Sequence, residues 1–380
     1  MVGQESLLKE ARRIVVKVGS ALVTNDGRGL DVRAIERWAG QIAALRAMGR
    51  EVLLVSSGAI AEGVLRIGWE TRPTRVCELQ AAAAVGQMGL AQAYEEHFGR
   101  HGIKTAQVLL THANLADREQ YLNARMTLIE LLGLGIVPVI NENDTVVTEE
   151  IKVGDNDTLG ALVTNLVEAD VLVILTDQRG LFTADPRSNP DAEFVQFAQA
   201  GDPALEKMAG GAASTLSKGG MITKIKAARV LMVAGIPLVV CDGHRAEAIV
   251  DAAAGEDVGT LFVAAKKPHE ITPKKLWIAL GDAARGALAV DDGAKAALIE
   301  RGSSLLSVGV RSVEGRFEAN DIVDIKDATG HLFARGKVAF ASDEAALAIG
   351  RTRAELQANR LLASLADKPL VHRDELVVFE

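Results

Sequence analysis

Short apolar runs alternate with longer amphipathic stretches through the first 265 residues of this 380-residue chain. Several runs are apolar almost throughout, which is typical of strands that are buried on both faces of a parallel sheet. The stretches between them repeat apolar residues at helical spacing, and this alternation predicts strand–helix–strand units with right-handed crossovers. The predicted fold class is therefore α/β, an open and mainly parallel sheet sandwiched by helices. The predicted strands span residues 13–18, 51–55, 103–110, 136–140, 170–175, 236–241 and 259–263.

Two of the predicted helices have recognisable ends. Asp31 can accept hydrogen bonds at the start of the first helix, and Gly49 can end that helix. Asp117 can start the second helix, and Gly133 can end it. Their apolar positions are Ile35, Trp38, Ile42 and Leu45 in the first helix, and Leu122, Met126, Ile129 and Leu132 in the second.

The pattern changes after residue 265. Residues 266–275 carry charges and two prolines with little apolar content, so they are predicted to form a linker. Residues 276–360 are predicted to form a small β-rich barrel, because short segments at 276–279, 305–310, 321–325 and 338–340 are separated by glycines. One helix is expected near residues 293–300, and another is expected to be capped by Ser342 or Asp343. Residues 361–380, with an apolar segment at 371–379, are set apart as a C-terminal tail.

Composition excludes several classes of protein. The chain has 42 Lys and Arg against 50 Asp and Glu, a net charge of −8, which makes it a poor general binder of nucleic-acid backbones. No apolar run approaches the roughly 18 residues that a membrane-spanning helix needs. The two cysteines cannot form a disulfide framework, which favours a reducing compartment. We therefore expect a cytoplasmic protein with no membrane partner.

Candidate chemistry begins with a lysine in the first predicted strand. No dinucleotide-binding glycine fingerprint and no Walker-type phosphate loop occur in the sequence. Ligands of open α/β sheets bind beyond the carboxyl ends of the strands, so polar residues at those ends are candidates. Lys17 could extend its amine to water from an edge strand, but apolar neighbours on both sides favour an anionic partner. Gly19 would let a phosphate approach the backbone closely.

Polar residues also follow the second and fourth predicted strands. Ser57 and Gly58 precede a helix whose first N–H groups could hold a carboxylate or phosphate, although Ser56 or Ser57 could simply cap that helix. The alternating run at 146–153 predicts a hairpin over the rim of a site, between two clusters rich in Asn and Asp. Their oxygens suit an ammonium group and their amides suit a carboxylate. The clusters are Asn141-Glu142-Asn143-Asp144 and Asp155-Asn156-Asp157.

Two later segments indicate a phosphate site. Thr176 and Asp177 end the strand predicted at 170–175, where an ordinary loop is the alternative. Gly219 and Gly220 open a helix with Lys224 one turn further on. A glycine pair and a lysine in this arrangement can bind phosphate, or they can be only a flexible cap.

Taken together and in this order, these segments resemble the amino acid kinase family, and within it the members that phosphorylate glutamate. The resemblance covers nearly the whole chain. The C-terminal region, around residues 291–294 and 300–306, resembles the PUA domain that is fused to many such kinases. Ser217 and Lys218 stand where the family usually has small residues, so Lys218 ranks below Lys224 as a nucleotide contact. The most specific matching segments are residues 138–144, 151–157 and 175–190.

The resemblance implies that ATP phosphorylates the γ-carboxylate of L-glutamate, the first step of proline biosynthesis. It implies catalytic roles for Lys17, Lys224 and Asp157. Mg²⁺ would arrive with the phosphates of ATP, and no protein ligand for it is assigned. The implied glutamate-binding residues are Ser57, Gly58, Asn141, Asp144, Asn156 and Asp157. The implied nucleotide-binding residues are Lys17, Gly19, Thr176, Asp177, Lys218, Gly219, Gly220, Met221, Ile222, Thr223 and Lys224.

Partners and alternatives follow from the same resemblance. It implies inhibition by proline, self-association into a dimer or tetramer, and a downstream reductase that consumes the labile glutamyl phosphate. A relative acting on acetylglutamate or aspartate is the nearest alternative, but the Asn/Asp hairpin and the fused C-terminal domain count against it. An RNA-binding protein acting through the PUA-like domain is the other alternative. Residues 276–350 hold 8 Lys/Arg and 11 Asp/Glu, a net charge of −3, so RNA is disfavoured as a partner.

Overall fold

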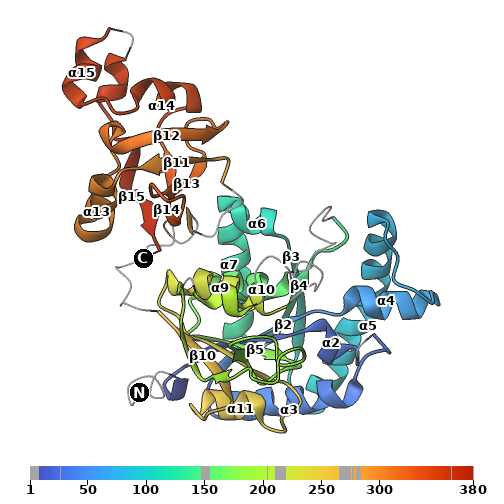
Figure 1. The fold of residues 1–380 in the computed structure, drawn as a ribbon. Helices are drawn as coiled ribbons and strands as arrows, with labels where there is room; N and C mark the ends of the chain where they lie inside the picture. Colours follow the sequence, from blue (N-terminus) through green and yellow to red (C-terminus); the bar gives the residue numbers. More distant parts are fainter. Residues whose placement is uncertain are drawn as a thin grey trace. The chain divides into compact units, whose positions relative to one another are not determined.

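The computed structural model describes residues 8–25, 27–146, 155–202, 204–209, 220–264, 275, 278–279, 284–360 and 362–379. The chain divides into two compact units, Met1–Lys267 and Pro268–Glu380 (Figure 1). The predicted linker at 266–275 spans this boundary and lies, apart from residue 275, outside the described residues. Among the helices of the described ranges, none is long and apolar enough to cross a membrane.

An eight-stranded sheet forms the centre of the first unit, in the order β3-β4-β2-β1-β5-β9-β10-β8. Neighbouring strands are parallel except β9 and β10, which are antiparallel. Every strand predicted from the apolar runs is confirmed, whereas three short strands of the described residues, β6, β7 and β8, have no counterpart in the prediction. The strands are β1 (Arg13–Val18), β2 (Glu51–Ser56), β3 (Thr105–Leu110), β4 (Val137–Glu142), β5 (Val171–Thr176), β8 (Phe197–Gln199), β9 (Leu238–Asp242) and β10 (Gly259–Val263).

Helices cover both faces of this sheet, which confirms the α/β fold class (Figure 1). Alternate residues of β1, namely Ile14, Val16 and Val18, join the core cluster that contains side chains of α3 (Val32–Ala47), α5 (Val76–Gly99) and α11 (Ala248–Ala253). Because side chains alternate along a strand, Lys17 belongs to the other face, where it lies against Gly160 of α8 (Asn156–Leu166). Helix α10 (Met221–Met232) packs against α8. The remaining helices of this unit are α2 (Ser20–Val23), α4 (Ala59–Ile67), α6 (His112–Ala116), α7 (Arg118–Gly133) and α9 (Ala204–Met208), and β6 (Leu181–Phe182) pairs with β7 (Phe194–Val195).

The two predicted helix starts are confirmed, but the buried face of α7 matches its predicted apolar positions only in part. The Asp31 carboxylate accepts from the Ala34 amide at the start of α3, and the Asp117 carboxylate accepts from the Gln120 amide at the start of α7. Along α7, however, Leu122 and Met126 are 40% and 63% exposed. The helix buries Tyr121, Leu128 and Leu132, so that of the four predicted positions only Leu132 is fully buried.

The second unit has a five-stranded sheet in the order β12-β11-β13-β14-β15, with β11 and β13 parallel and the other pairs antiparallel. Helix α13 (Asp292–Arg301), near the predicted 293–300, begins at the Asp291 cap. The other elements are β11 (Gly286–Val290), η3 (Ser307–Gly309), β12 (Val310–Gly315), β13 (Ile322–Lys326), β14 (Leu332–Val338), α14 (Ser342–Ala348), α15 (Arg353–Ala358), η4 (Ala363–Ala366) and β15 (Val371–Val378).

Several details of this unit differ from the sequence prediction, among them the β segment predicted at 305–310, where residues 307–309 form η3 and β12 begins only at Val310. Residues 361–380 are not a separate tail, because β15 pairs with β14 and buries Leu376 and Val377 in the same sheet. Ile278 and Ala279, predicted within a β segment, are helical, since so short an apolar run has no period that separates strand from helix. Helix α14 is capped by Ala341, whose amide donates to Glu344 of the first turn, and not by either predicted residue.

Candidate functional site

Three charged side chains from distant segments meet on one face of the large sheet, and we call them the charged cluster. Lys17 comes from β1, Asp157 from the first turn of α8 and Lys224 from the first turn of α10. The Lys17 Nζ lies 2.6 Å from Asp157 Oδ1, and the Lys224 Nζ lies 3.0 Å from Asp157 Oδ2. All three side chains are buried. The alternative that Lys17 lies on an edge strand and extends its amine to water is therefore wrong.

Local structure explains how each member reaches the cluster. The Asp155 carboxylate caps α8 by accepting from the Thr158 amide at 3.0 Å, which puts Asp157 in the first turn of that helix. Thr223 precedes Lys224 on α10, and its hydroxyl donates to Asp157 Oδ2 at 2.6 Å. One carboxylate thus holds both a strand and a second helix in place.

Burial and charge act in opposite directions on these groups. Burial lowers the pKa of Lys17 below its ordinary value, because desolvation outweighs the attraction of Asp157. Burial alone would raise the pKa of Asp157, but Lys17 and Lys224 together hold it far below its usual range. Asp157 is therefore ionised at every ordinary pH. The amine of Lys17 is incompletely compensated, so an additional anion near it would be favoured.

A second group of polar side chains lies where β2 and β4 end, and we call Gln87, Asn141 and Asn156 the amide chain. Asn141 Nδ2 donates to Gln87 Oε1 at 2.8 Å, and Asn156 Nδ2 donates to Asn141 Oδ1 at 2.9 Å. Asn156 Nδ2 also lies 2.9 Å from Ser57 Oγ and 3.2 Å from the Ser56 carbonyl. All three amide side chains are buried. The amide chain joins α5 on one face of the sheet to α8 on the other.

The backbone after β2, at Ser57 and Gly58, places the Ser57 hydroxyl against Asn156. Gly58 is the cap residue of α4 and has a φ of 107°, a conformation that side chains disfavour. A Cβ there would also lie only 3.0 Å from the Thr24 methyl group. No serine side chain caps α4, so the alternative of a simple capping role for Ser56 or Ser57 is excluded. The Ser57 hydroxyl instead meets Asn156.

Asp144 lies in the turn after β4 and is partly buried. Burial raises its pKa to about 6, although the nearby Arg72 lowers it. A carboxylate with such a pKa changes charge just below neutral pH. The hairpin predicted at 146–153 lies outside the described residues, apart from Val146.

The segments predicted to bind nucleotide also lie at the carboxyl ends of strands. Thr176 ends β5, its hydroxyl donates to Asp177 at 3.1 Å, and its carbonyl accepts from the Gly243 amide at 2.9 Å. Gly220 caps α10 without a side-chain hydrogen bond, and Met221 and Ile222 follow in the first turn. Such a helix start attracts anions. Lys218 and Gly219 lie outside the described residues.

Gly19 contributes space and not an unusual conformation. Its φ of −74° is accessible to any residue. A Cβ at this position would lie 3.8 Å from the Lys17 amine and 3.7 Å from the Leu175 carbonyl. The missing side chain therefore leaves room beside the charged cluster.

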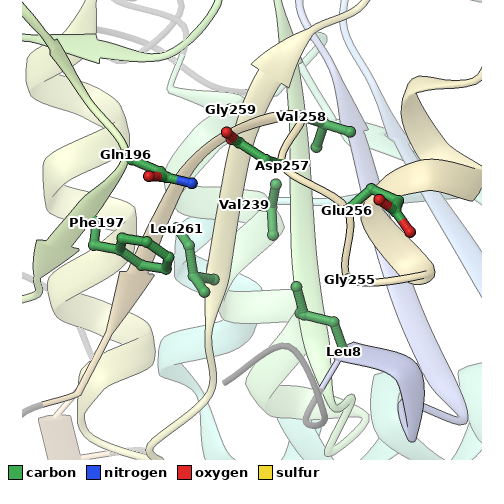
Figure 2. A pocket seen from close by; sticks show the side chains of 10 residues that line it. All are labelled: Leu8, Gln196, Phe197, Val239, Gly255, Glu256, Asp257, Val258, Gly259 and Leu261. Carbon is green, nitrogen blue, oxygen red and sulfur yellow. The ribbon is translucent and has the colours of Figure 1, made fainter. Parts of the chain in front are cut away.

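A small pocket lies elsewhere in the first unit, at β8, β9, β10 and the turn before β10 (Figure 2). Leu8, Val239 and Leu261 supply apolar side chains to it, and no member of the charged cluster or amide chain lines it. Its volume of about 40 Å³ holds a few water molecules at most. It is too small for an amino acid or a nucleotide.

Comparison with known proteins gives matches for both units of the chain. The family model described as "Amino acid kinase family" matches residues 12–242, and the model of the PUA domain matches residues 286–358. The glutamate 5-kinase of Ralstonia nicotianae is 57% identical over 373 residues, covering 98% of this chain and 99% of that protein. The glutamate 5-kinase of Delftia acidovorans is 56% identical, with 98% of both chains covered. The chain belongs to the amino acid kinase family, in its glutamate 5-kinase branch.

The resemblance recognised in the sequence is thus confirmed for both regions of the chain. A solved structure of UMP kinase from Bacillus anthracis is also similar, with a TM-score of 0.47 and 16% identity over 67% of this chain and 97% of that one. This likeness carries no functional information.

Sequence reasoning missed two polar residues of this candidate site. Gln87 is part of the amide chain, and the Tyr94 hydroxyl lies 2.9 Å from Ser56 Oγ. Both lie on α5, seven residues apart and therefore on one face of the helix. A spacing of seven between two polar residues on the buried face of α5 was the only available signal, and it names no ligand.

Proposed function

We propose that this protein transfers the γ-phosphoryl group of ATP to the γ-carboxylate of L-glutamate, giving L-glutamyl 5-phosphate and ADP in the first step of proline biosynthesis. The observation that carries the proposal is the convergence of two lysine amines on one buried carboxylate. The curated relatives named glutamate 5-kinase, which match the chain nearly from end to end, support the choice of substrate.

The chemistry requires charge neutralisation more than proton transfer. The γ-carboxylate of glutamate has a pKa near 4.3, so it is already an anion at neutral pH and needs no general base. Its approach to the γ-phosphate brings two anions together. Lys17 and Lys224 would neutralise this charge from opposite sides, and Asp157 would hold both amines in position.

Glutamate recognition is assigned to residues around the amide chain. Asp144 would pair with the α-ammonium group of glutamate. Ser57, Asn141 and Asn156 would supply neutral hydrogen-bonding groups, and the N–H groups beyond Gly58 would hold a carboxylate. The burial of Asn141 and Asn156 supports this assignment, since buried amides are fixed in orientation.

ATP is assigned to the strand ends of β1 and β5 and to the start of α10. The open space at Gly19 would accept a phosphate, as would the first turn of α10 from Gly220 to Lys224. Thr176, Asp177, Lys218 and Gly219 complete the proposed nucleotide segments. Mg²⁺ would enter as MgATP. Within the described ranges no group of three His, Cys, Asp or Glu could hold a metal ion, so no protein ligand is assigned to it.

The test is ATP-dependent formation of a hydroxamate when hydroxylamine traps the acyl phosphate. L-glutamate should give the product, and N-acetylglutamate, which lacks the ammonium group, should react at least about a hundredfold less efficiently. Aspartate serves as the shorter acceptor in the same panel. A preference for either alternative acceptor would contradict the proposal.

The proposal extends to regulation, assembly and location. Proline, which shares the α-carboxylate of glutamate and a charged nitrogen, should inhibit by competing with glutamate in the same assay. We further propose a dimer or tetramer, measurable by light scattering, a reductase that consumes the labile product, and a cytoplasmic location. The PUA domain is assigned a structural or regulatory role, because the net charge of −3 over residues 276–350 disfavours RNA.

A further inference from the structure

The direction of every amide in the amide chain is fixed by two backbone groups. The Glu142 amide N–H donates to Asn141 at 2.8 Å, so the Asn141 atom facing it is the carbonyl oxygen. The Nδ2 of Asn141 therefore faces Gln87, which must present its own oxygen. At the other end the Ser56 carbonyl can only accept, so Asn156 presents Nδ2 to it. No side-chain amide of the amide chain can exchange its oxygen and nitrogen positions without loss of hydrogen bonds.

Within the described part of the chain, this direction leaves one acceptor of the amide chain, Asn156 Oδ1, and one donor, Gln87 Nε2, without a protein partner. The two protons of Asn156 Nδ2 are shared among three acceptors, the Ser56 carbonyl, Ser57 Oγ and Asn141 Oδ1. Asn156 Oδ1 is buried and has no hydrogen-bond partner among the residues that the structure describes. A buried acceptor without a partner is costly unless a ligand supplies the donor. Glutamate at neutral pH has one such donor, its ammonium group.

Helix α5 fixes the position of Gln87, the member of the amide chain that lies farthest from Asn156. Gly86, next to Gln87, contacts α4 so closely that a Cβ would lie 1.8 Å from the Ala59 carbonyl. Likewise, a Cβ at Gly63 of α4 would lie only 1.7 Å from the Ala82 carbonyl oxygen of α5. The two helices are therefore packed backbone to backbone beside the site. The position of Gln87 relative to the segment that follows β2 is fixed by this contact.

We infer that Gln87 is a positioning residue for the amino-acid substrate. Its carbonyl oxygen holds Asn141, Asn141 holds Asn156, and Asn156 then presents its oxygen to the ammonium group of glutamate. The inference rests on the proposed function and adds a residue that does not touch the reacting atoms. It assigns Gln87 to glutamate affinity and not to ATP affinity or to phosphoryl transfer.

The test compares variants of α5 by steady-state kinetics in the hydroxamate assay. Gln87→Met keeps nearly the same shape but removes the acceptor, and it should raise the glutamate KM about tenfold with little change in the ATP KM. Gln87→Glu keeps an oxygen that accepts from Asn141 and should restore a KM within about threefold of the wild type. Gln92→Met, the same change at an exposed position of α5, is the matched control.

Other outcomes would overturn the inference. An unchanged glutamate KM in Gln87→Met, or equal rises in both KM values with a lower melting temperature, would show that Gln87 has no such role. A double-mutant cycle with Asn141→Ala provides a second measurement: the effects on glutamate KM should be strongly non-additive, and simple additivity would contradict transmission through Asn141. Absence of glutamate-dependent product in the wild type would instead refute the proposed function itself.

Discussion

The charged cluster and the amide chain both depend on the first turn of α8, yet their stabilities have different origins. Asp157 attracts two amines, and these attractions keep its carboxylate ionised although they only partly offset the cost of burying Lys17. Asn156, one residue earlier, is held by neutral hydrogen bonds whose directions are dictated by backbone groups. The charged cluster is suited to stabilise charge that develops during a reaction. The amide chain is suited to hold a ligand in one orientation.

The largest effect is expected in the charged cluster. Lys17→Met and Lys224→Met should each lower kcat at least about a hundredfold at saturating substrates, because each removes a preorganised cation. Lys226→Met, an exposed lysine on the same helix as Lys224, is the control and should keep wild-type turnover. Wild-type kcat in either cluster variant would refute its catalytic assignment.

An intermediate effect is expected at Asp144, beside the amide chain. Asp144 is charged above a pKa of about 6, so kcat/KM for glutamate should fall as the pH decreases from 7 to 5. Glutamate itself does not cause this fall, because its γ-carboxyl group titrates near 4.3. Asp144→Asn should raise the glutamate KM about tenfold at pH 7.5, the effect of one lost charged pair.

The pH profile of the Asp144→Asn variant separates this role from others. The step near pH 6 should disappear while the ATP KM stays constant. Persistence of the step would assign it to another group, and a selective rise in the ATP KM would count against Asp144 as a glutamate-binding residue.

The smallest effect is expected at Tyr94. Burial raises the pKa of its hydroxyl, which stays protonated and bonds Ser56 at the end of β2. Tyr94→Phe keeps the packing and removes one neutral hydrogen bond, so glutamate KM should change less than about threefold. A change as large as that of Gln87→Met would mean that α5 controls the site through Ser56 as much as through Asn141.

Much of the first unit could be predicted from its sequence because the relevant forces are local. Continuous apolar runs give the strands of a sheet that is buried on both faces, and single side chains such as Asp31 and Asp117 fix helix starts. Lys17 was recognisable because its charge interrupts such a run. The order of the polar segments was sufficient to identify the family.

The tertiary structure decided what local pattern leaves open. It selected the buried stripe of α7, placed β15 in the second sheet, and brought Lys17 and Lys224 to the same carboxylate. It also gave Gln87 and Tyr94 their partners, since a polar residue on a helix has no preferred partner until another element packs against it. Strands and caps are set by neighbours in sequence, whereas the direction of a buried hydrogen bond is set by groups that only folding brings together.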